Sequence, residues 1–314
     1  MAAPLGTQAT ALVTGASGFV GGHLVARLVR EGMPVVALDS AAPRTPFPAG
    51  VHDLRIDIRD HDAVARALAE ARPAVVYHIA AQASVAISMR EPELDIATNV
   101  LGTVQLARAA VAAGVQRFVF VSTGGALCGE PATLPVTEHT PVAPESVYGA
   151  SKLAAERYLA LLLGGSGTAL AVVRPGNIYG PAQNPHGEAG VVAIFAARML
   201  AGEPVTIFGD GSQQRDYVYV DDVVDAIVRA ATAPPDTCLV GTGHGTSTRA
   251  IFDVLARLTG YARPPELAAE RPGDIQRIWL DSTRARERWG WQPRTTLEDG
   301  LARTVDWFRA HAAP

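Results

Sequence analysis

The chain has 314 residues, of which 48 % are hydrophobic and 18 % are charged, so it is long enough to bury a large core. Its net charge of −4 gives no general electrostatic reason to bind nucleic acid or an anionic membrane, and we expect neither as a partner. The N-terminus lacks a signal-peptide pattern, and no apolar run reaches membrane-spanning length. Cys128 and Cys238 make neither a disulfide framework nor a metal cluster. We therefore expect a cytoplasmic protein without a metal site.

The first predicted strand, residues 10–14, leads directly into a glycine-rich turn. Gly15, Gly18 and Gly21 follow it, and apolar residues at helical spacing then continue to residue 29. Such glycines permit a tight turn and close approach of the backbone to a pyrophosphate. The helix that begins at Phe19 and Val20 would offer free N–H groups to the phosphates. The turn therefore predicts a dinucleotide site.

A second predicted strand, residues 34–38, ends at Asp39. This acid lies about 20 residues past the glycines, where a carboxylate accepts hydrogen bonds from an adenosine ribose. A carboxylate there would repel the 2′-phosphate of NADP, so we expect NAD as the cofactor. Arg44 is close enough in sequence to leave NADP as an alternative.

The rest of the first half alternates strands with helices. Strands are predicted at residues 53–56, 74–78, 117–121 and 169–173, and helices at about 60–70, 93–113 and 146–163. This pattern indicates an α/β fold with a Rossmann-type, doubly wound parallel sheet. After residue 174 glycine and proline become dense, and helices are predicted near 188–201, 220–232, 247–259 and 296–311. We expect a nucleotide-binding domain at 1–174 that carries the catalytic residues, and a smaller mixed lobe at 175–314 that returns some segments to the first domain.

All but one of the 27 basic side chains are arginine, and the exception, Lys152, lies four residues after Tyr148. Residues i and i+4 share one face of a helix, so both side chains would point the same way. A nearby cation favours the phenolate, so we expect Lys152 to lower the pKa of Tyr148 and the pair to transfer protons. Helical pairs of this spacing are also common surface features, which is the alternative interpretation.

Together with the glycine turn and Ser122-Thr123 at a strand end, this pair resembles the extended short-chain dehydrogenase/reductase family. The resemblance continues through nearly the whole chain and is closest to the nucleotide-sugar epimerases. The further segments that carry it are 78–88, 99–103, 174–181, 215–222 and 271–274. It implies an NAD-dependent 4-epimerase of a UDP-hexose of the UDP-glucose/UDP-galactose type, which oxidises C4 to a ketone and returns the hydride to the opposite face.

The resemblance also implies roles for individual residues. Tyr148 would accept the proton of the C4 hydroxyl, and Lys152 would also reach the nicotinamide ribose. Thr123 would hydrogen-bond the same sugar oxygen, with Ser122 as the alternative. Further cofactor contacts are implied for Asp57, Ile58, Ala80, Ala81, Gln82 and Asn99.

The UDP part of the substrate would be bound by residues of the second lobe. Asn177, Arg215 and Arg271 are implied as diphosphate or uridine-ribose ligands, since arginine matches phosphate oxygens bidentately. Asp274 would accept from ribose hydroxyls. Taken singly, each has a local alternative: Asn177 in a turn, Arg215 paired with a neighbouring acid, and residues 271–274 in a proline–glycine turn.

The positions after Thr123 distinguish reactions within the family. Related dehydratases carry an acidic pair there, whereas this chain has Gly124 and Gly125, which cannot move protons and therefore favour epimerisation. Cys128 stands where many relatives have tyrosine, which affects the wall expected to face the substrate. His186 could border the sugar, but no role is assigned to it.

Several alternatives stay open. Ile278 replaces a bulkier residue of some epimerases, so UDP-N-acetylglucosamine could be the substrate, and UDP-glucuronate is a further possibility. A nucleotide-sugar oxidoreductase and a non-catalytic NAD(H)- or nucleotide-sugar-binding regulator are the non-epimerase alternatives. We also expect a homodimer built on the helices near 93–113 and 146–163, because these carry additional apolar residues. The apolar residues meant are Leu101, Val104, Leu106, Val111 and 159–163.

Overall fold

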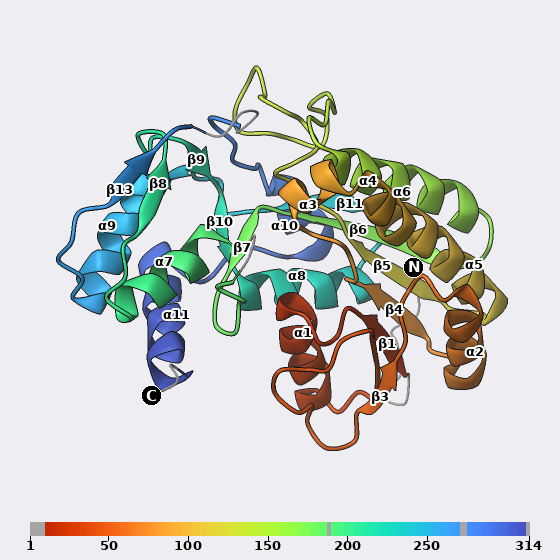
Figure 1. The fold of residues 1–314 in the computed structure, drawn as a ribbon. Helices are drawn as coiled ribbons and strands as arrows, with labels where there is room; N and C mark the ends of the chain where they lie inside the picture. The colour runs from red at the N-terminus through yellow and green to blue at the C-terminus, as the bar shows by residue number, and fades with distance from the viewer. Residues whose placement is uncertain (1–9, 187–189, 271–274, 312–314) are drawn as a thin grey trace.

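A seven-stranded parallel sheet forms the centre of the protein, in a computed structural model that describes residues 10–186, 190–270 and 275–311 (Figure 1). The strand order is β3-β2-β1-β4-β5-β6-β11, so the direction of winding reverses between β1 and β4. The strands are β1 (Ala11–Thr14), β2 (Val35–Asp39), β3 (His52–Arg55), β4 (Val75–His78), β5 (Arg117–Val121), β6 (Ala169–Pro175) and β11 (Thr237–Val240). The predicted Rossmann-type fold class is confirmed, and the reversal point is where such sheets bind ligands.

Helices cover both faces of this sheet (Figure 1). One face carries α2 (His61–Ala71), α5 (Thr103–Ala112) and α6 (Val147–Leu163), and the other carries α1 (Phe19–Arg30) and α8 (Val220–Thr232). Alternate residues of β5 enter the two cores: Phe118 and Phe120 pack toward α5 and α6, and Val119 and Val121 toward α8.

The predicted helix at 93–113 is present, but it is not uniform. It consists of α4 (Pro92–Asp95), a π-helical stretch η1 (Ile96–Gly102) and then α5. The wider turns bury Asn99 and Gly102, and a Cβ on Gly102 would lie 3.2 Å from the Ile58 side chain. Such π-helical segments often occur at functional sites. The preceding short helix α3 (Val85–Arg90) was not predicted.

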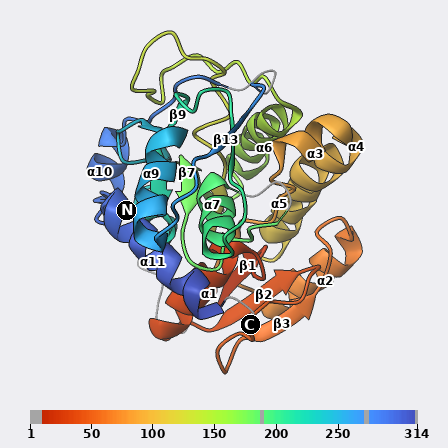
Figure 2. The same ribbon diagram turned by 60° about the vertical axis from the view of Figure 1, so that its left-hand side comes forward.

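The second half of the chain builds a smaller lobe from short strand pairs and helices (Figure 2). Strand β7 (Asn177–Tyr179) pairs with β10 (Tyr217–Tyr219), β8 (Thr206–Phe208) with β13 (Glu266–Ala268), and β9 (Gln214–Arg215) with β12 (Thr246–Ser247). The helices of this half besides α8 are α7 (Val191–Leu200), α9 (Thr248–Thr259), α10 (Thr283–Trp289) and α11 (Leu297–His311).

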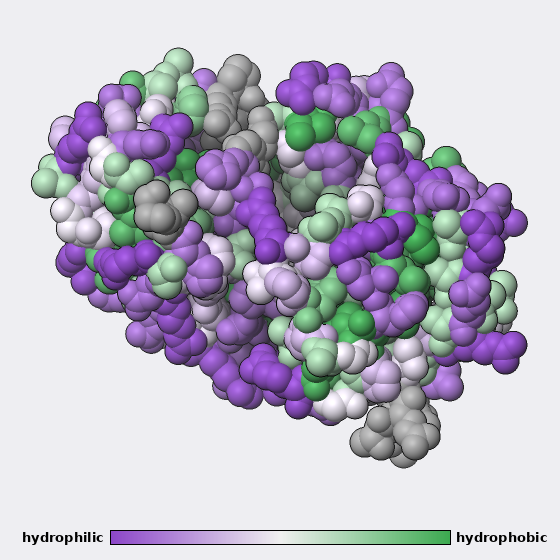
Figure 3. Space-filling model, turned by 60° about the horizontal axis from the view of Figure 1, so that its bottom comes forward, coloured by the Kyte–Doolittle hydropathy of each residue, from purple (hydrophilic) through white to green (hydrophobic). Residues whose placement is uncertain are grey.

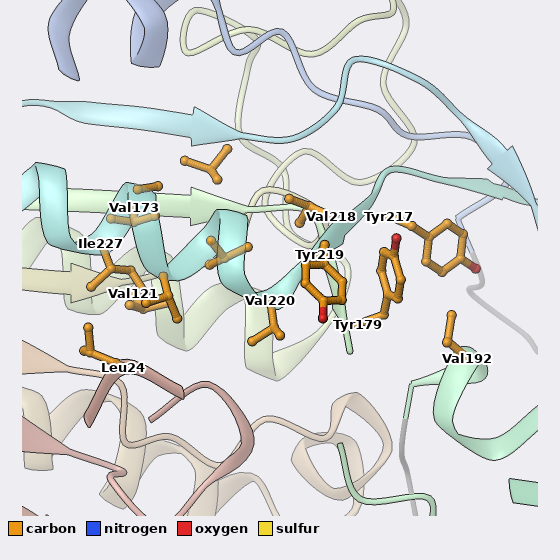
Figure 4. Close-up of a cluster of buried hydrophobic side chains, with 14 of the residues drawn as sticks. Leu24, Val121, Val173, Tyr179, Val192, Tyr217, Val218, Tyr219, Val220 and Ile227 are labelled. Carbon is orange, nitrogen blue, oxygen red and sulfur yellow. The ribbon is translucent and has the colours of Figure 1, made fainter. Parts of the chain in front are cut away.

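One continuous core joins the lobe to the sheet. Figure 4 shows Val121 and Val173 of the sheet in the same cluster as Tyr179, Tyr217 and Tyr219 of the lobe. Strand β11 and helix α8, although late in the sequence, pack with the central sheet. The expected boundary at residue 174 falls inside strand β6. The division of the chain into two domains stays a prediction.

Exposed apolar side chains gather on α3, η1 and α6, and both α3 and η1 pack against α6. They are Val85, Met89, Ile96, Leu101, Tyr158 and Leu161. Of the residues expected on this surface, Leu106, Leu159 and Leu163 are instead buried in the chain's own core, because they face the sheet. Within the described residues, no helix is long and apolar enough to cross a membrane.

Candidate active site

The glycine turn after β1 is closely packed. Gly15 has φ +70°, a conformation that favours glycine, and a Cβ on Gly21 would lie only 2.0 Å from the Gly15 carbonyl oxygen. Helix α1 therefore begins directly on the turn. Gly18, the residue before α1, has no side chain that could cap the helix. The first N–H groups of α1 are therefore available to an anion.

Asp39 lies at the carboxyl end of β2, beside this turn. Its Oδ2 accepts a hydrogen bond from the Ser17 N–H at 3.0 Å, and its Oδ1 accepts from the Ala41 N–H at 2.9 Å. Arg55 is its register partner on β3 and donates to Ser17 Oγ and the Ala41 carbonyl oxygen. Sequence reasoning considered Arg44 here and missed Arg55. The parallel order of β2 and β3, which puts both strand ends at one edge, could have indicated it.

His78, the last residue of β4, helps to fix the loop after this strand through a series of hydrogen bonds. Thr103 Oγ1 donates to the Asn99 carbonyl oxygen and accepts from His78 Nε2 at 2.8 Å. His78 Nδ1 then accepts from Thr14 Oγ1 at 2.8 Å, and Thr14 Oγ1 accepts from the N–H groups of residues 79 and 80. Burial and the charge of Lys152 keep the pKa of His78 well below its usual value, in agreement with a neutral ring.

The side-chain amide of Asn99 forms two hydrogen bonds with the backbone of Gln82. Asn99 Oδ1 accepts from the Gln82 N–H at 2.9 Å, and Asn99 Nδ2 donates to the Gln82 carbonyl oxygen at 2.8 Å. Both side-chain amides also donate to Asp95 Oδ2. The partly exposed Ala80 and Ala81 lie in the loop that is held in this way. Asp95 was missed by sequence reasoning, because nothing local marks an acid in a helix as buried.

Asp57 and Ile58 follow β3 at the same edge of the sheet. Arg59 donates to both carboxylate oxygens of Asp57 and lowers the pKa of this acid. Ile58 is buried against Gly102 of η1. Asp57 therefore has a structural partner in addition to the adenine contact expected from the resemblance.

Helix α6 begins close to the loop that follows β5. Ser146 Oγ caps it by accepting from the Gly149 N–H at 3.1 Å, and the Tyr148 N–H donates to Ser88 Oγ at 3.0 Å. A Cβ on Gly149 would lie 2.3 Å from the Ala126 carbonyl oxygen. The glycine next to Tyr148 thus allows the helix start and the loop to touch.

Lys152 lies one turn further along α6 and is only 3 % exposed. Its Nζ donates to the Val121 carbonyl oxygen at 2.9 Å and lies 4.7 Å from the centroid of the Phe120 ring. Burial lowers its pKa to about 8, although Glu156 and Asp95 act in the opposite direction. The lone lysine is therefore buried beside the end of β5 and is not a surface feature.

The expected effect of Lys152 on Tyr148 is wrong for the protein by itself. Burial of the phenol, together with the negative charge of Asp95, raises the pKa of Tyr148 to about 12. The reason is that the loss of hydration disfavours the phenolate, and the charge of Asp95 acts in the same direction. A phenolate at neutral pH would need further positive charge.

Ser122 and Thr123 follow β5 directly after Val121, whose carbonyl oxygen accepts the hydrogen bond from Lys152. The Ser122 N–H continues the sheet ladder by donating to the Val173 carbonyl oxygen, and Ser122 lies two residues after Phe120, on the α6 side. Ser122 Oγ is buried and has no hydrogen-bond partner among the described residues. Thr123 is 9 % exposed and lies past the strand end. Ser122 Oγ therefore has unused hydrogen-bonding capacity.

Two of the four expected UDP ligands lie together in the lobe. The Asn177 N–H donates to the carbonyl oxygen of Asp216, the residue after Arg215, at 2.7 Å. The carboxylate of Asp216 accepts from residues 242, 243 and 280, so it ties Arg215 to two further segments. Arg271 and Asp274 lie outside the described residues.

The remaining positions singled out in the sequence have packing roles. A Cβ on Gly124 would lie 2.5 Å from Leu280 Cδ1, whereas one on Gly125 would meet Asn177 Oδ1 at an ordinary 3.5 Å. Cys128 and Ile278 are buried in one small apolar cluster, which explains how a cysteine fits there and leaves Ile278 only 1 % exposed. The His186 N–H donates to the Asn184 side chain in an exposed turn.

The surface is hollowed between the lobe and the sheet domain (Figure 3). The carboxyl ends of β1, β4 and β5, with the residues described above, are on the sheet side of the molecule, and Asn177 and Arg215 are on the lobe side. The uncapped start of α1, the tight glycine turn and Asp39 fit a dinucleotide, with its pyrophosphate on the helix and a ribose at Asp39.

Comparison with known proteins gives a consistent result. The sequence matches the model of the NAD dependent epimerase/dehydratase family over residues 11–241. A UDP-glucose 4-epimerase of Mycolicibacterium smegmatis is 47 % identical over 307 residues, which cover 95 % of this chain and 98 % of the relative. The Thermotoga maritima UDP-glucose 4-epimerase structure with UDP-glucose aligns with a TM-score of 0.93 at 42 % identity, covering 96 % of this chain and 99 % of that one. The Thermus thermophilus UDP-glucose 4-epimerase complex with NAD gives a TM-score of 0.91 at 43 % identity, covering 96 % of this chain and 100 % of that one.

Proposed function

This chain belongs to the NAD-dependent epimerase/dehydratase family, and we propose that it is an enzyme that interconverts UDP-glucose and UDP-galactose by inverting C4 of the hexose. The observation that carries the proposal is that the only lysine, Lys152, which lies one helical turn after Tyr148, is buried and bonded to the carbonyl oxygen of Val121, the residue before Ser122 and Thr123. These residues belong to a chain that aligns over nearly its whole length with UDP-glucose 4-epimerases.

NAD, when bound, supplies a hydride acceptor that later returns the hydride, and a positively charged ring. The residues that would hold it are the first N–H groups of α1, Asp39, the loop of Ala80 to Gln82, and Lys152. Asp57, Ile58 and Asn99 would complete the adenine and nicotinamide ends of the site. The charge of the ring would add to that of Lys152, which gives Tyr148 the positive charge that the protein alone does not provide.

Each polar group of the site has a part in the proposed reaction. Tyr148 accepts the proton of the C4 hydroxyl and later returns it. Ser122 or Thr123 donates a hydrogen bond to the same oxygen and steadies the ketone. We favour Ser122 because its buried hydroxyl has no partner among the described residues.

Asn177 and Arg215 would bind the diphosphate or the uridine ribose from the lobe, and Arg271 and Asp274 keep the roles implied by the family resemblance. Gly124 and Gly125 supply no acid or base, which is why we propose epimerisation and not elimination of water.

The test is product analysis by NMR with UDP-glucose, UDP-N-acetylglucosamine and UDP-glucuronate as separate substrates, without added NAD. We expect UDP-galactose from UDP-glucose until both sugars are at equilibrium. Stoichiometric formation of NADH would instead indicate an oxidoreductase, and binding without turnover would indicate a regulator. Faster turnover of either other sugar would move the assignment to that substrate.

The same preparation tests the cofactor. Denatured, purified protein should release NAD into the supernatant, because Asp39 is placed to repel a 2′-phosphate. Release of NADP alone would show that Arg55, and not Asp39, determines the choice of cofactor.

We also propose that the enzyme is a homodimer and acts in the cytoplasm. The apolar side chains exposed on α3, η1 and α6 support the dimer. The two cysteines are buried free thiols, as is usual in a reducing compartment.

A further inference from the structure

A buried carboxylate lies where the lobe joins the sheet. Asp216 stands between β9 and β10 and is 2 % exposed. Its Oδ1 accepts from the backbone N–H and from the hydroxyl of Thr242, at 2.8 and 2.6 Å. Its Oδ2 accepts from the N–H groups of Gly243 and Leu280, each at 3.1 Å. Four donors therefore surround one carboxylate and compensate its loss of hydration.

The backbone around Asp216 is packed closely against the ends of two strands of the central sheet. A Cβ on Gly241, which follows β11, would lie 2.4 Å from Asp216 Oδ2. A Cβ on Gly176, which follows β6, would lie 2.6 Å from the Asp216 carbonyl oxygen. That oxygen accepts from the Asn177 N–H at 2.7 Å. Since β6 and β11 are neighbours in the sheet, Asp216 joins the start of the lobe to the carboxyl edge of the sheet.

Two of the expected UDP ligands are held through this residue. Arg215 precedes Asp216 in the chain, and the backbone of Asn177 is bonded to the Asp216 carbonyl group. On the other side of Arg215, the Gln214 carbonyl oxygen accepts from the Ile278 N–H at 3.1 Å. The backbone of Arg215 is thus fixed on both sides, which limits the positions that its guanidinium can take.

We propose that Asp216 is a positioning residue for the UDP-sugar, which sets the place of Arg215 and Asn177 relative to the central sheet. The inference rests on the proposed function, because it takes both residues as ligands of the UDP part. Ordering a ligand-binding side chain at the moment of binding costs affinity, so a backbone that is fixed beforehand strengthens binding. Asp216 is enclosed by its own donors, and it acts through its two neighbours and not by contact with the reacting atoms.

The test compares Asp216→Asn with the wild type. Asparagine has nearly the same shape, but its NH2 group would face either the N–H groups of Gly243 and Leu280 or the N–H of Thr242, so at least one hydrogen bond is lost in both orientations. We expect the Kd of UDP, measured by calorimetry on the NAD-containing enzyme, to rise roughly tenfold or more, because the segments that hold Arg215 shift. KM for UDP-glucose should rise with it, while kcat stays within about twofold, the pattern of a loss of uniform binding.

Asp222→Asn is the matched control. Asp222, in the first turn of α8, is also buried and also accepts from a backbone N–H, that of Thr295 at 3.0 Å. Thr295 is not among the expected UDP ligands. Both substitutions should lower the free energy of unfolding in urea, whereas only Asp216→Asn should weaken UDP binding. The comparison therefore separates positioning of the ligand from a general loss of stability.

Thr242→Val is the second variant, and it decides the question if Asp216→Asn does not fold. It removes one of the four donors and keeps the carboxylate, so the Kd of UDP should rise several-fold. An unchanged Kd of UDP in the folded variant would overturn the proposal, and so would an equal rise in Asp222→Asn. UDP binding does not require turnover. A wild type that binds UDP without converting UDP-glucose would therefore contradict the proposed reaction alone, whereas a wild type that does not bind UDP would overturn both.

Discussion

Lys152 carries its charge in a place where burial disfavours it. Its pKa falls to about 8, so between that pH and the unfolded value near 10.5 the unfolded chain binds more protons than the folded one. The burial cost is therefore fully present below pH 8 and disappears as the pH rises toward 10.5. It amounts to about 3 kcal/mol. The site thus contains a residue that destabilises the fold, as functional residues often do.

This predicts that Lys152→Met changes the pH dependence of stability. Urea unfolding of the NAD-free proteins at several pH values gives the free energy of unfolding of the variant relative to that of the wild type. This relative free energy should be most favourable to the variant at pH 7. It should become less favourable to the variant as the pH rises above 8. The slope is the readout, because the lost hydrogen bond to Val121 lowers the stability of the variant at every pH. A difference that does not vary with pH would contradict the predicted burial cost.

A second prediction concerns the shape of the cation. In Lys152→Arg the charge is kept, but the wide planar guanidinium cannot occupy the space between the Val121 carbonyl oxygen and the Phe120 ring. We expect kcat for UDP-glucose to fall by roughly 10²- to 10⁴-fold, the range of a positioned acid–base group. Arg157→Lys, an exposed exchange on the same helix, is the control and should retain full activity. Near-normal turnover of Lys152→Arg would mean that the lone lysine is an accident of composition.

The sequence was informative about individual residues where a motif names the residue type, as for Asp39, Tyr148 and Lys152. It was not informative about their electrostatic balance. The pKa of Tyr148 is raised first by burial and then by the charge of Asp95, a residue that is distant in sequence, and neither effect can be seen in the motif itself. Arg55 was missed for the same reason, because it approaches Asp39 only once β3 pairs with β2.

At the level of elements, the start of α1 depends on one glycine. A Cβ on Gly21 would lie 2.0 Å from the Gly15 carbonyl oxygen, whereas one on the next residue, Gly22, would meet its nearest neighbour at an ordinary 3.8 Å. The two glycines therefore form a natural matched pair for testing the dinucleotide turn.

We predict that Gly21→Ala pushes α1 away from the turn and that the purified protein no longer contains NAD. Gly22→Ala should keep its NAD and be more stable by up to about 1 kcal/mol, since alanine favours a helix interior over glycine. Cofactor content after denaturation and a urea titration give the two readouts. Equal NAD content in both variants would show that close packing of the turn is not what the site requires.

Helices and strands were predicted well where the apolar residues form a clear pattern, as in β5 and α8. The helix at 93–113 was predicted as one element. Its π-helical part was not predicted, because its buried residues contact Gln82 and Ile58, which are distant in sequence and leave no local pattern. The two-residue strands β9 and β12 have too few residues for any period, so only the lobe's tertiary packing defines them.

At the scale of the whole molecule, the order of the strands in the sheet explains why a single boundary in the sequence does not separate the sheet domain from the lobe. The chain leaves the sheet after β6, builds much of the lobe, and returns through α8 and β11 to pack beside the first half. The sequence predicts that some segments after residue 174 return to the first domain, but composition does not identify α8 and β11 as these segments. A site between the two parts can therefore be held rigidly, since one continuous core lies beneath both.

The last prediction concerns assembly. Leu161 of α6 is 78 % exposed and Leu101 of η1 is 45 % exposed, and four further exposed apolar side chains lie on these two elements and on α3. A monomer would leave this patch in water, whereas a two-fold contact between copies of α6 and η1 would bury it on both sides. We expect light scattering to report twice the mass of one 32.9 kDa chain, and Leu161→Glu combined with Leu101→Glu to report a single chain. Leu267→Glu places one such charge on a leucine of β13 in the lobe that is 66 % exposed, and this variant should stay dimeric. A wild-type monomer at micromolar concentration would contradict the dimer, and dissociation by Leu267→Glu would place the contact on the lobe instead of on these helices.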